Sequence, residues 1–205
     1  AFVSKTAILD CMASGNRTKI NRLVSQWPKG AVFTQAYLTQ IGYNANLVKS
    51  YKKSQWIETV GSGAYKLFDD KIEWYGGLYA LQKQLQLHVH AGGKTALELK
   101  GFGHYGKLAE SSCFLFGARG ERLPKWFAEY DWGVKIIYKA SNFLQPELTE
   151  SFSEYPYRDF SITLSAPERA ALQMLYHVPA LQGFDEAYKI MENLVALRPA
   201  VVQAL

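Results

Sequence analysis

The sequence predicts a mixed α+β protein with two domains, and three observations support this. The 205 residues are 48% hydrophobic and 20% charged, a composition typical of globular proteins with an apolar core. Apolar residues recur mainly at helical spacing in the first third of the chain, whereas short strands and helices alternate after it. The acidic pair Asp69 and Asp70 lies between these regions. We therefore expect one domain over residues 1–70 and a second, mixed α/β domain over residues 71–205.

The first domain is expected to begin with two helices. A short one is predicted over residues 6–14, which a Ser-Gly-Asn break follows. A second helix starts at Lys19 and ends before Pro28. Its apolar residues have the i, i+3, i+4, i+7 spacing of a buried helix face, and they are Ile20, Leu23, Val24 and Trp27. Residues 31–33 are expected to be extended.

Two further helices follow, each preceded by a residue suited to cap it. Thr34 is expected to cap a helix that ends at Gly42, and Asn44 to cap a helix over residues 45–54. The apolar residues of this last helix share one face, and they are Leu47, Val48 and Tyr51.

A β-hairpin is predicted next, because strand-like residues 56–60 and 64–68 flank a Gly-Ser-Gly turn. The order helix, short strand, helix, glycine turn, helix, hairpin is that of a winged helix-turn-helix. In such motifs the turn between the two central helices often contains a glycine, which is the position of Gly42. The first domain is therefore expected to be a winged helix-turn-helix.

The second domain alternates between helices and strands, and the pattern alone does not give its topology. Helices are expected over residues 78–85, 95–99, 124–130, 167–176 and 185–194. Strands are expected over residues 87–90, 112–116, 134–139 and 160–164.

Positive charge concentrates in the first domain. Residues 1–68 contain nine lysines and arginines against two acidic residues, a net charge of +7, whereas the rest of the chain carries −2. A basic module joined to a near-neutral domain is typical of proteins that bind a polyanion, although lysine-rich helices also occur as ordinary solvated surfaces.

The residue types on the outer face of the third helix favour DNA as that polyanion. Asparagine can bond adenine, and lysine can reach guanine or a phosphate. The start of the preceding helix offers N–H groups to phosphate, and the small wing turn can approach a groove closely. The candidate DNA-binding residues are Thr34, Gln35, Asn44, Asn46, Lys49, Ser50, Lys52, Lys53, Ser62 and Lys66. Double-stranded DNA is the expected partner, and no cofactor is expected.

Longer strings of residues resemble a known family. They are KINRL at 19–23, WPKG at 27–30, YKKSQW at 51–56, GSGAY at 61–65, YALQ at 79–82, HAGGKTALEL at 90–99, LPKWF at 123–127 and SAPERA at 165–170. These strings resemble the AbiEi-type antitoxins, the transcriptional regulators of the AbiE abortive-infection systems, from about residue 19 to residue 176.

This resemblance implies an autorepressor that binds repeats at the promoter of its own operon and can self-associate there. It also implies a nucleotidyltransferase toxin as the functional partner, in a type IV system where antitoxin and toxin need not form a stable complex. No residue of the second domain is assigned a role by the resemblance.

A metal-binding enzyme is one alternative. On a strand, His88 and His90 would point to the same face, and Glu98 and His104 follow further along. The spacing to Glu98 is nevertheless longer than a cupin-like site needs, and residues 94–99 have a helical pattern. A second alternative is a protein-interaction module, because aromatic residues make up 14% of the chain.

Other catalytic or compartmental signals are weak. Residues 92–95, Gly-Gly-Lys-Thr, are similar to the end of a phosphate-binding loop but lack its first glycine. Cys113 precedes an apolar run and is expected in the core. Together with Cys11 it follows no CxxC spacing, which favours a reducing cytoplasm. No secretory signal is evident at the N-terminus, and no apolar run approaches the ~18 residues of a membrane helix.

Overall fold

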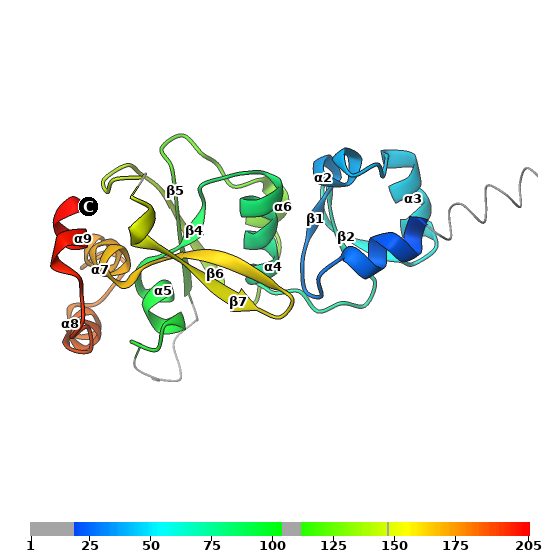
Figure 1. The fold of residues 1–205 in the computed structure, drawn as a ribbon. Coiled ribbons are helices and arrows are strands. Elements are labelled where there is room, and N and C mark those ends of the chain that lie inside the picture. The colour runs from blue at the N-terminus through cyan, green and yellow to red at the C-terminus, as the bar shows by residue number, and fades with distance from the viewer. Residues whose placement is uncertain (1–18, 104–111, 147) are drawn as a thin grey trace, which may run out of the picture.

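A computed structural model describes residues 19–103, 112–146 and 148–205, and it has two lobes side by side (Figure 1). The smaller lobe contains a three-stranded sheet and the larger a five-stranded sheet. The helix expected over residues 6–14 lies outside the described residues. Every helix within the described ranges is too short or too polar to cross a bilayer.

The smaller lobe is a winged helix-turn-helix, as predicted. Its elements are a helix over residues 19–26, β1 (Phe33–Thr34), α2 (Gln35–Gln40), α3 (Ala45–Lys53), β2 (Ile57–Gly61) and β3 (Ala64–Leu67). The strands are antiparallel in the order β1-β3-β2, and the β2–β3 hairpin is the wing.

Local capping explains where the two central helices begin. The Thr34 hydroxyl accepts a hydrogen bond from the Tyr37 N–H, and the Asn44 side chain accepts one from the Leu47 N–H. Both predicted caps are thereby confirmed. Gly42 has φ +91°, a left-handed conformation that glycine adopts at little cost and that turns the chain from α2 into α3.

One apolar core holds the three helices of this lobe on the sheet. Leu23, Leu38 and Ile57 are almost completely buried in it. The rings of Trp27 and Phe33 stack at 4.0 Å, which joins the first helix to β1. The core therefore fixes α3 relative to the wing.

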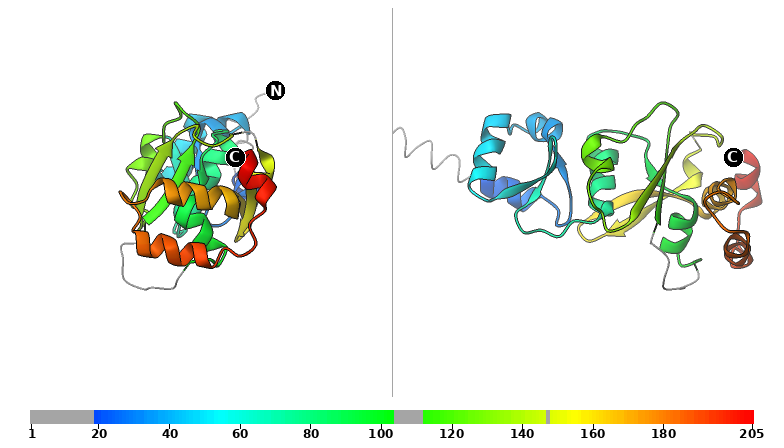
Figure 2. Two further views of the ribbon diagram at one scale, coloured as in Figure 1. Left: turned by 90° about the vertical axis from the view of Figure 1, so that its left-hand side faces the viewer. Right: turned by 180° about the vertical axis from the view of Figure 1, so that it is seen from behind.

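The larger lobe places helices around a mixed sheet with the strand order β6-β5-β4-β8-β7. Pairs β5–β6 and β4–β8 are parallel, and the other two are antiparallel. The strands are β4 (His90–Ala91), β5 (Ser112–Gly117), β6 (Lys135–Ala140), β7 (Phe152–Tyr157) and β8 (Phe160–Ser165). The helices are α4 (Trp74–Tyr79), π-helical η1 (Ala80–Gln84), α5 (Gly93–Leu99), α6 (Lys125–Ala128), the 3-10 turn η2 (Thr149–Ser151), α7 (Pro167–Tyr176), α8 (Phe184–Glu192) and α9 (Pro199–Ala204). Figure 2 shows α7, α8 and α9 gathered at the end of this lobe that lies away from the winged helix.

Several elements differ from the sequence prediction, and a shortened strand and two unexpected elements are the clearest of them. The strand expected over residues 87–90 is reduced to His90–Ala91, since the Leu87 N–H already donates to the Leu81 carbonyl. Strand β7 was not predicted because Pro156 interrupts its pattern, but β7 is an edge strand, where proline is tolerated. Helix α9 was also not predicted.

The two lobes meet along β1, the α4–η1 segment and the preceding linker, and also at the wing, where Gly61 lies against Trp126 of α6. The Val32 N–H donates to the Gly76 carbonyl, and the Gly30 N–H donates to the Asp70 carboxylate. The side-chain amide of Gln84 accepts from the Thr34 N–H at 2.8 Å and donates to the Val32 carbonyl at 2.7 Å. Hydrogen bonds therefore cross the junction, and the domain division at residue 70 stays a prediction.

We expect Gly76→Ala to destabilise the protein strongly. A Cβ atom at residue 76 would overlap the Gly30 carbonyl oxygen, which is backbone and cannot swing aside. Overpacking of this kind costs about 1–3 kcal/mol or more in the free energy of unfolding, measurable by urea denaturation. Gly183→Ala is the matched control, because a Cβ at Gly183 would meet nothing within 4 Å. Equal stability of the two variants would contradict the close approach at the junction.

Candidate nucleic-acid interface

Helix α3 presents a polar face to solvent, and it is the centre of the candidate interface. Val48 and Tyr51 are 1% and 4% exposed and pack into the core, while Leu47 is half-buried. The opposite side of the helix is exposed and carries Asn46, Lys49, Ser50 and Lys53. The helix therefore lies as the sequence predicted. Figure 1 shows it on the side of its lobe that points away from the five-stranded sheet, so the larger lobe leaves this face open.

The residues at the start of α2 form most of their hydrogen bonds within the protein. Thr34 is 3% exposed, and its hydroxyl caps the helix. The Gln35 N–H donates to the Gly63 carbonyl at 2.8 Å, and the Gln35 side chain accepts from the Tyr65 hydroxyl. These two candidate residues join α2 to the wing, so they position the interface and have few donors left for a phosphate.

The wing brings Ser62 to an exposed turn, where Gly63 has φ +73°. Lys66 behaves differently from the other candidate lysines. Its ammonium group pairs with the Glu58 carboxylate at 2.8 Å and donates to the Asp70 carbonyl, and its side chain is only 16% exposed. The charge of Lys66 is therefore neutralised within the protein.

Three lysines of α3 keep their charge available. Lys49, Lys52 and Lys53 are exposed, and none of them forms an ion pair with another residue in the described part of the chain. The Lys52 ammonium lies 5.9 Å from the centre of the Tyr65 ring, which draws it toward the wing. Unpaired cations on one exposed helix are what a phosphate backbone attracts.

Sequence reasoning missed one feature of this region. The aromatic side chains of Trp56 and Phe68 are 45% and 49% exposed at the base of the wing, where the Phe68 N–H donates to the Trp56 carbonyl. The only signal for them in the sequence is that an aromatic residue stands at each outer end of the predicted hairpin.

Only one of the two histidines lies on a strand. His88 precedes β4, and its exposed ring bonds to the Glu121 carboxylate at 2.8 Å. His90 is buried, with Nδ1 against the His88 carbonyl and Nε2 against the Gln173 amide. Burial lowers the pKa of His90 to about 4, so its ring is neutral at physiological pH. His104 lies outside the described residues, within which no three His, Cys, Asp or Glu side chains gather to hold a metal.

The Gly-Gly-Lys-Thr segment and Cys113 have structural roles in the larger lobe. Lys94 pairs with Glu98 and Glu186, and the Thr95 hydroxyl accepts a hydrogen bond from the Phe114 N–H. The Thr95 bond holds α5 on the sheet. Cys113 is buried, and burial raises the pKa of its thiol, which keeps it protonated. Cys11 lies outside the described residues.

Several aromatic residues of the larger lobe that could form a protein-binding surface instead pack inside it. Trp126 and Trp132 are each 6% exposed. The ring of Tyr75 stacks on those of Tyr157 and Tyr155, with centroids 4.3 and 6.2 Å away.

These elements define a winged helix-turn-helix joined to an α+β lobe, an arrangement typical of DNA-binding regulators. Residues 16–108 match the family model described as the N-terminal domain of the AbiEi antitoxin transcriptional regulator. Residues 110–205 match the model of the AbiEi antitoxin transcriptional regulator of type IV toxin–antitoxin systems. The chain therefore belongs to the AbiEi family, as the resemblance of its residues indicated. The family is one of regulators and antitoxins.

A solved structure has the same fold. The crystal structure of the RV2827C protein from Mycobacterium tuberculosis superposes with a TM-score of 0.60 over 90% of this chain and 68% of that chain, at 16% sequence identity. At this identity the likeness concerns the fold alone. No curated protein matches the chain in sequence.

Loss of the α3 cap should lower the stability of the protein while leaving the lysines of α3 in place. Replacing Asn44 by alanine removes the acceptor for the Leu47 N–H, which sits 3.0 Å away, and we expect a loss of about 1 kcal/mol in unfolding free energy. Asn44→Ser should restore most of this stability, since serine caps comparably. Urea denaturation of both variants provides the measurement. A serine variant as unstable as the alanine variant would show that the cap is not the cause.

Proposed function

We propose that this protein represses its own operon by inserting α3 into the major groove of repeats in the promoter. The observation that supports this most directly is the exposed Asn/Lys face of α3, opposite a buried apolar face. Asn46 can make paired hydrogen bonds to adenine, and Lys49 and Lys53 can reach guanine or phosphate. Family membership supports the regulatory role.

The other candidate residues would contact the DNA backbone around this helix. Lys52 lies near the C-terminal end of α3 and Ser62 at the tip of the wing, and both residues are exposed, as contacts to phosphates require. Binding to successive repeats would place several protomers on one promoter, which allows self-association there. Association of this kind would occur in the cytoplasm.

The protein is also proposed to act as the antitoxin for a nucleotidyltransferase encoded in the same operon, without a stable complex. Membership in a family of type IV antitoxins supports this role, and the larger lobe is the part we assign to it. A metal-dependent enzyme is not favoured, because both ring nitrogens of His90 already bond within the protein and the His88 ring bonds to Glu121.

The lysines of α3 provide the sharpest test of DNA binding. Lys49→Ala/Lys53→Ala should weaken binding to a duplex of the protein's own promoter and reduce the slope of log affinity against log salt by about 1–2. Fluorescence anisotropy at several salt concentrations measures both quantities, and circular dichroism checks the fold. The matched control is Lys135→Ala/Lys189→Ala, which removes the same charge from exposed positions of the larger lobe. If the α3 variant and this control bind equally well, α3 is not the recognition helix.

Antitoxin activity should be separable from DNA binding. Co-expression with the nucleotidyltransferase from the adjacent gene should rescue growth equally for wild type and for Lys49→Ala/Lys53→Ala, because these lysines lie in the smaller lobe. Failure of the wild-type protein to rescue growth would contradict the antitoxin role and leave the DNA-binding test unaffected.

A further inference from the structure

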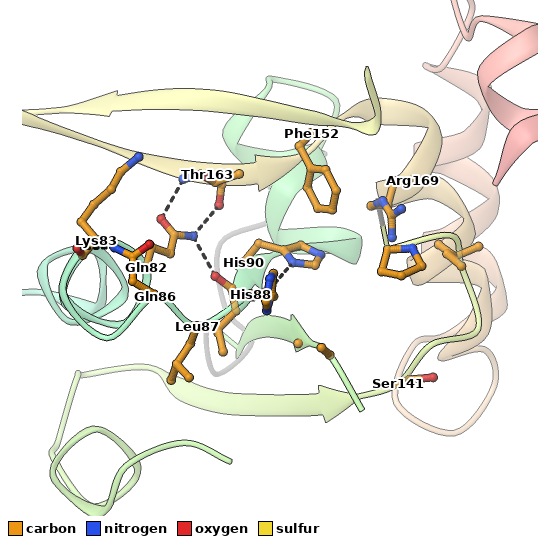
Figure 3. Close-up of a pocket in the computed structure, with 15 residues that line it drawn as sticks. Gln82, Lys83, Gln86, Leu87, His88, His90, Ser141, Phe152, Thr163 and Arg169 are labelled. Carbon is orange, nitrogen blue, oxygen red and sulfur yellow. Dashed lines mark hydrogen bonds between the residues drawn. The ribbon is translucent and has the colours of Figure 1, made fainter. Parts of the chain in front are cut away.

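The larger lobe contains a cavity that the proposed DNA-binding role does not use. Its volume is about 350 Å³, within the range of small-molecule sites (Figure 3). It lies between η1, the segment before β4 and the start of α7, far along the chain from α3. Much of its wall is apolar and consists of Leu87, Val89, Leu144, Pro146 and Phe152.

A buried arginine lines this cavity. Arg169 is 4% exposed, and its guanidinium lies 4.5 Å from the centre of the Phe152 ring. Its Nε donates to the Ser151 hydroxyl at 2.7 Å, and one of its terminal nitrogens donates to the Gln145 carbonyl. Both acceptors are neutral. A guanidinium has five N–H donors, so these two bonds leave donors for a further acceptor.

The charge of Arg169 has no counterion among the residues that the structure describes. The neighbouring carboxylate, Glu168, is turned to Arg198, which binds it through Nε at 2.9 Å and through a terminal nitrogen at 2.9 Å. Buried arginines are ordinarily paired with an acidic group, because removing a lone charge from water is costly. Burial lowers the pKa of Arg169 to about 10, which still leaves it protonated at neutral pH.

The other buried polar groups of the cavity are already satisfied. The Gln82 amide bonds to the Val89 carbonyl and to both the N–H and the carbonyl of Thr163, as Figure 3 shows. The His90 ring bonds on both nitrogens, as described above. Arg169 is therefore the buried group through which this cavity can bind a charged ligand.

We propose that this cavity binds a small organic anion, with a carboxylate or phosphate on Arg169 and a flat apolar body against Phe152 and Leu87. An anionic group would complete the hydrogen bonding of the guanidinium and neutralise its charge, and such charge-assisted bonds are strong and geometrically specific. The apolar wall suits an aromatic or aliphatic body, and the volume excludes a macromolecule. This inference does not depend on DNA binding.

Fluorine NMR on the full chain tests the proposal with three probes that share a fluorophenyl ring. We expect 4-fluorobenzoate and 4-fluorophenyl phosphate to bind, and neutral 4-fluorobenzamide to bind at least about tenfold more weakly, because it lacks the charge that Arg169 recognises. The ratio of the first two affinities distinguishes a carboxylate ligand from a phosphate ligand. Equal binding of the amide, or no broadening by either anion at millimolar concentration, would overturn the proposal.

Variants locate the binding site. Arg169→Gln should weaken binding of the anions by about tenfold or more, whereas Arg22→Gln, which removes an exposed arginine from the smaller lobe, should leave it unchanged. A folded Arg169→Gln protein that binds both anions normally would refute the assignment. If Arg169→Gln does not fold, Leu87→Trp provides the test, because it keeps the arginine but fills the cavity. This variant should not bind the anions, and retained binding would place the site elsewhere.

Discussion

The orientation of α3 is the constraint on which the rest of the interface depends. Val48 and Tyr51 hold the helix against the core, and burying an apolar side chain of this size contributes about 1.5–3 kcal/mol. Because a helix repeats every 3.6 residues, this anchoring leaves Asn46, Lys49 and Lys53 no direction but outward. The Asn44 cap and the Gly42 turn fix where the helix starts, so its lysines keep a defined position relative to the wing.

The sequence predicted what short-range rules control. The caps at Thr34 and Asn44, the turn at Gly42 and the wing hairpin each depend on a few neighbouring residues, and all were predictable. The strand order of the larger sheet was not, because it depends on pairings between distant segments. The strand predicted over residues 87–90 was also too long at its start, since the His88 N–H donates to the Glu121 carboxylate and not to a neighbouring strand.

The net charge of the sequence predicted a basic domain, but it did not show which of its lysines form ion pairs. Lys66 contributes to the net charge of the first domain as much as Lys49 does, yet Glu58 neutralises it in the fold. Arg169 is the converse case. In the sequence it stands next to Glu168, and only the fold shows that the Glu168 carboxylate binds Arg198. Sites defined by a missing partner are therefore not readable from residue order.

The contact between Gln84 and β1 decides whether one edge of the small sheet is open. β1 is an edge strand of the small sheet, and the Gln84 amide bonds to its Thr34 N–H and to the carbonyl of Val32, directly before it, as the peptide group of an adjoining strand would. A strand whose outer row of backbone groups is unoccupied recruits strands from other molecules. The Gln84 side chain, together with the Gly76 carbonyl that accepts the Val32 N–H, thus occupies the backbone groups at this edge, so the edge is closed to a strand from another molecule.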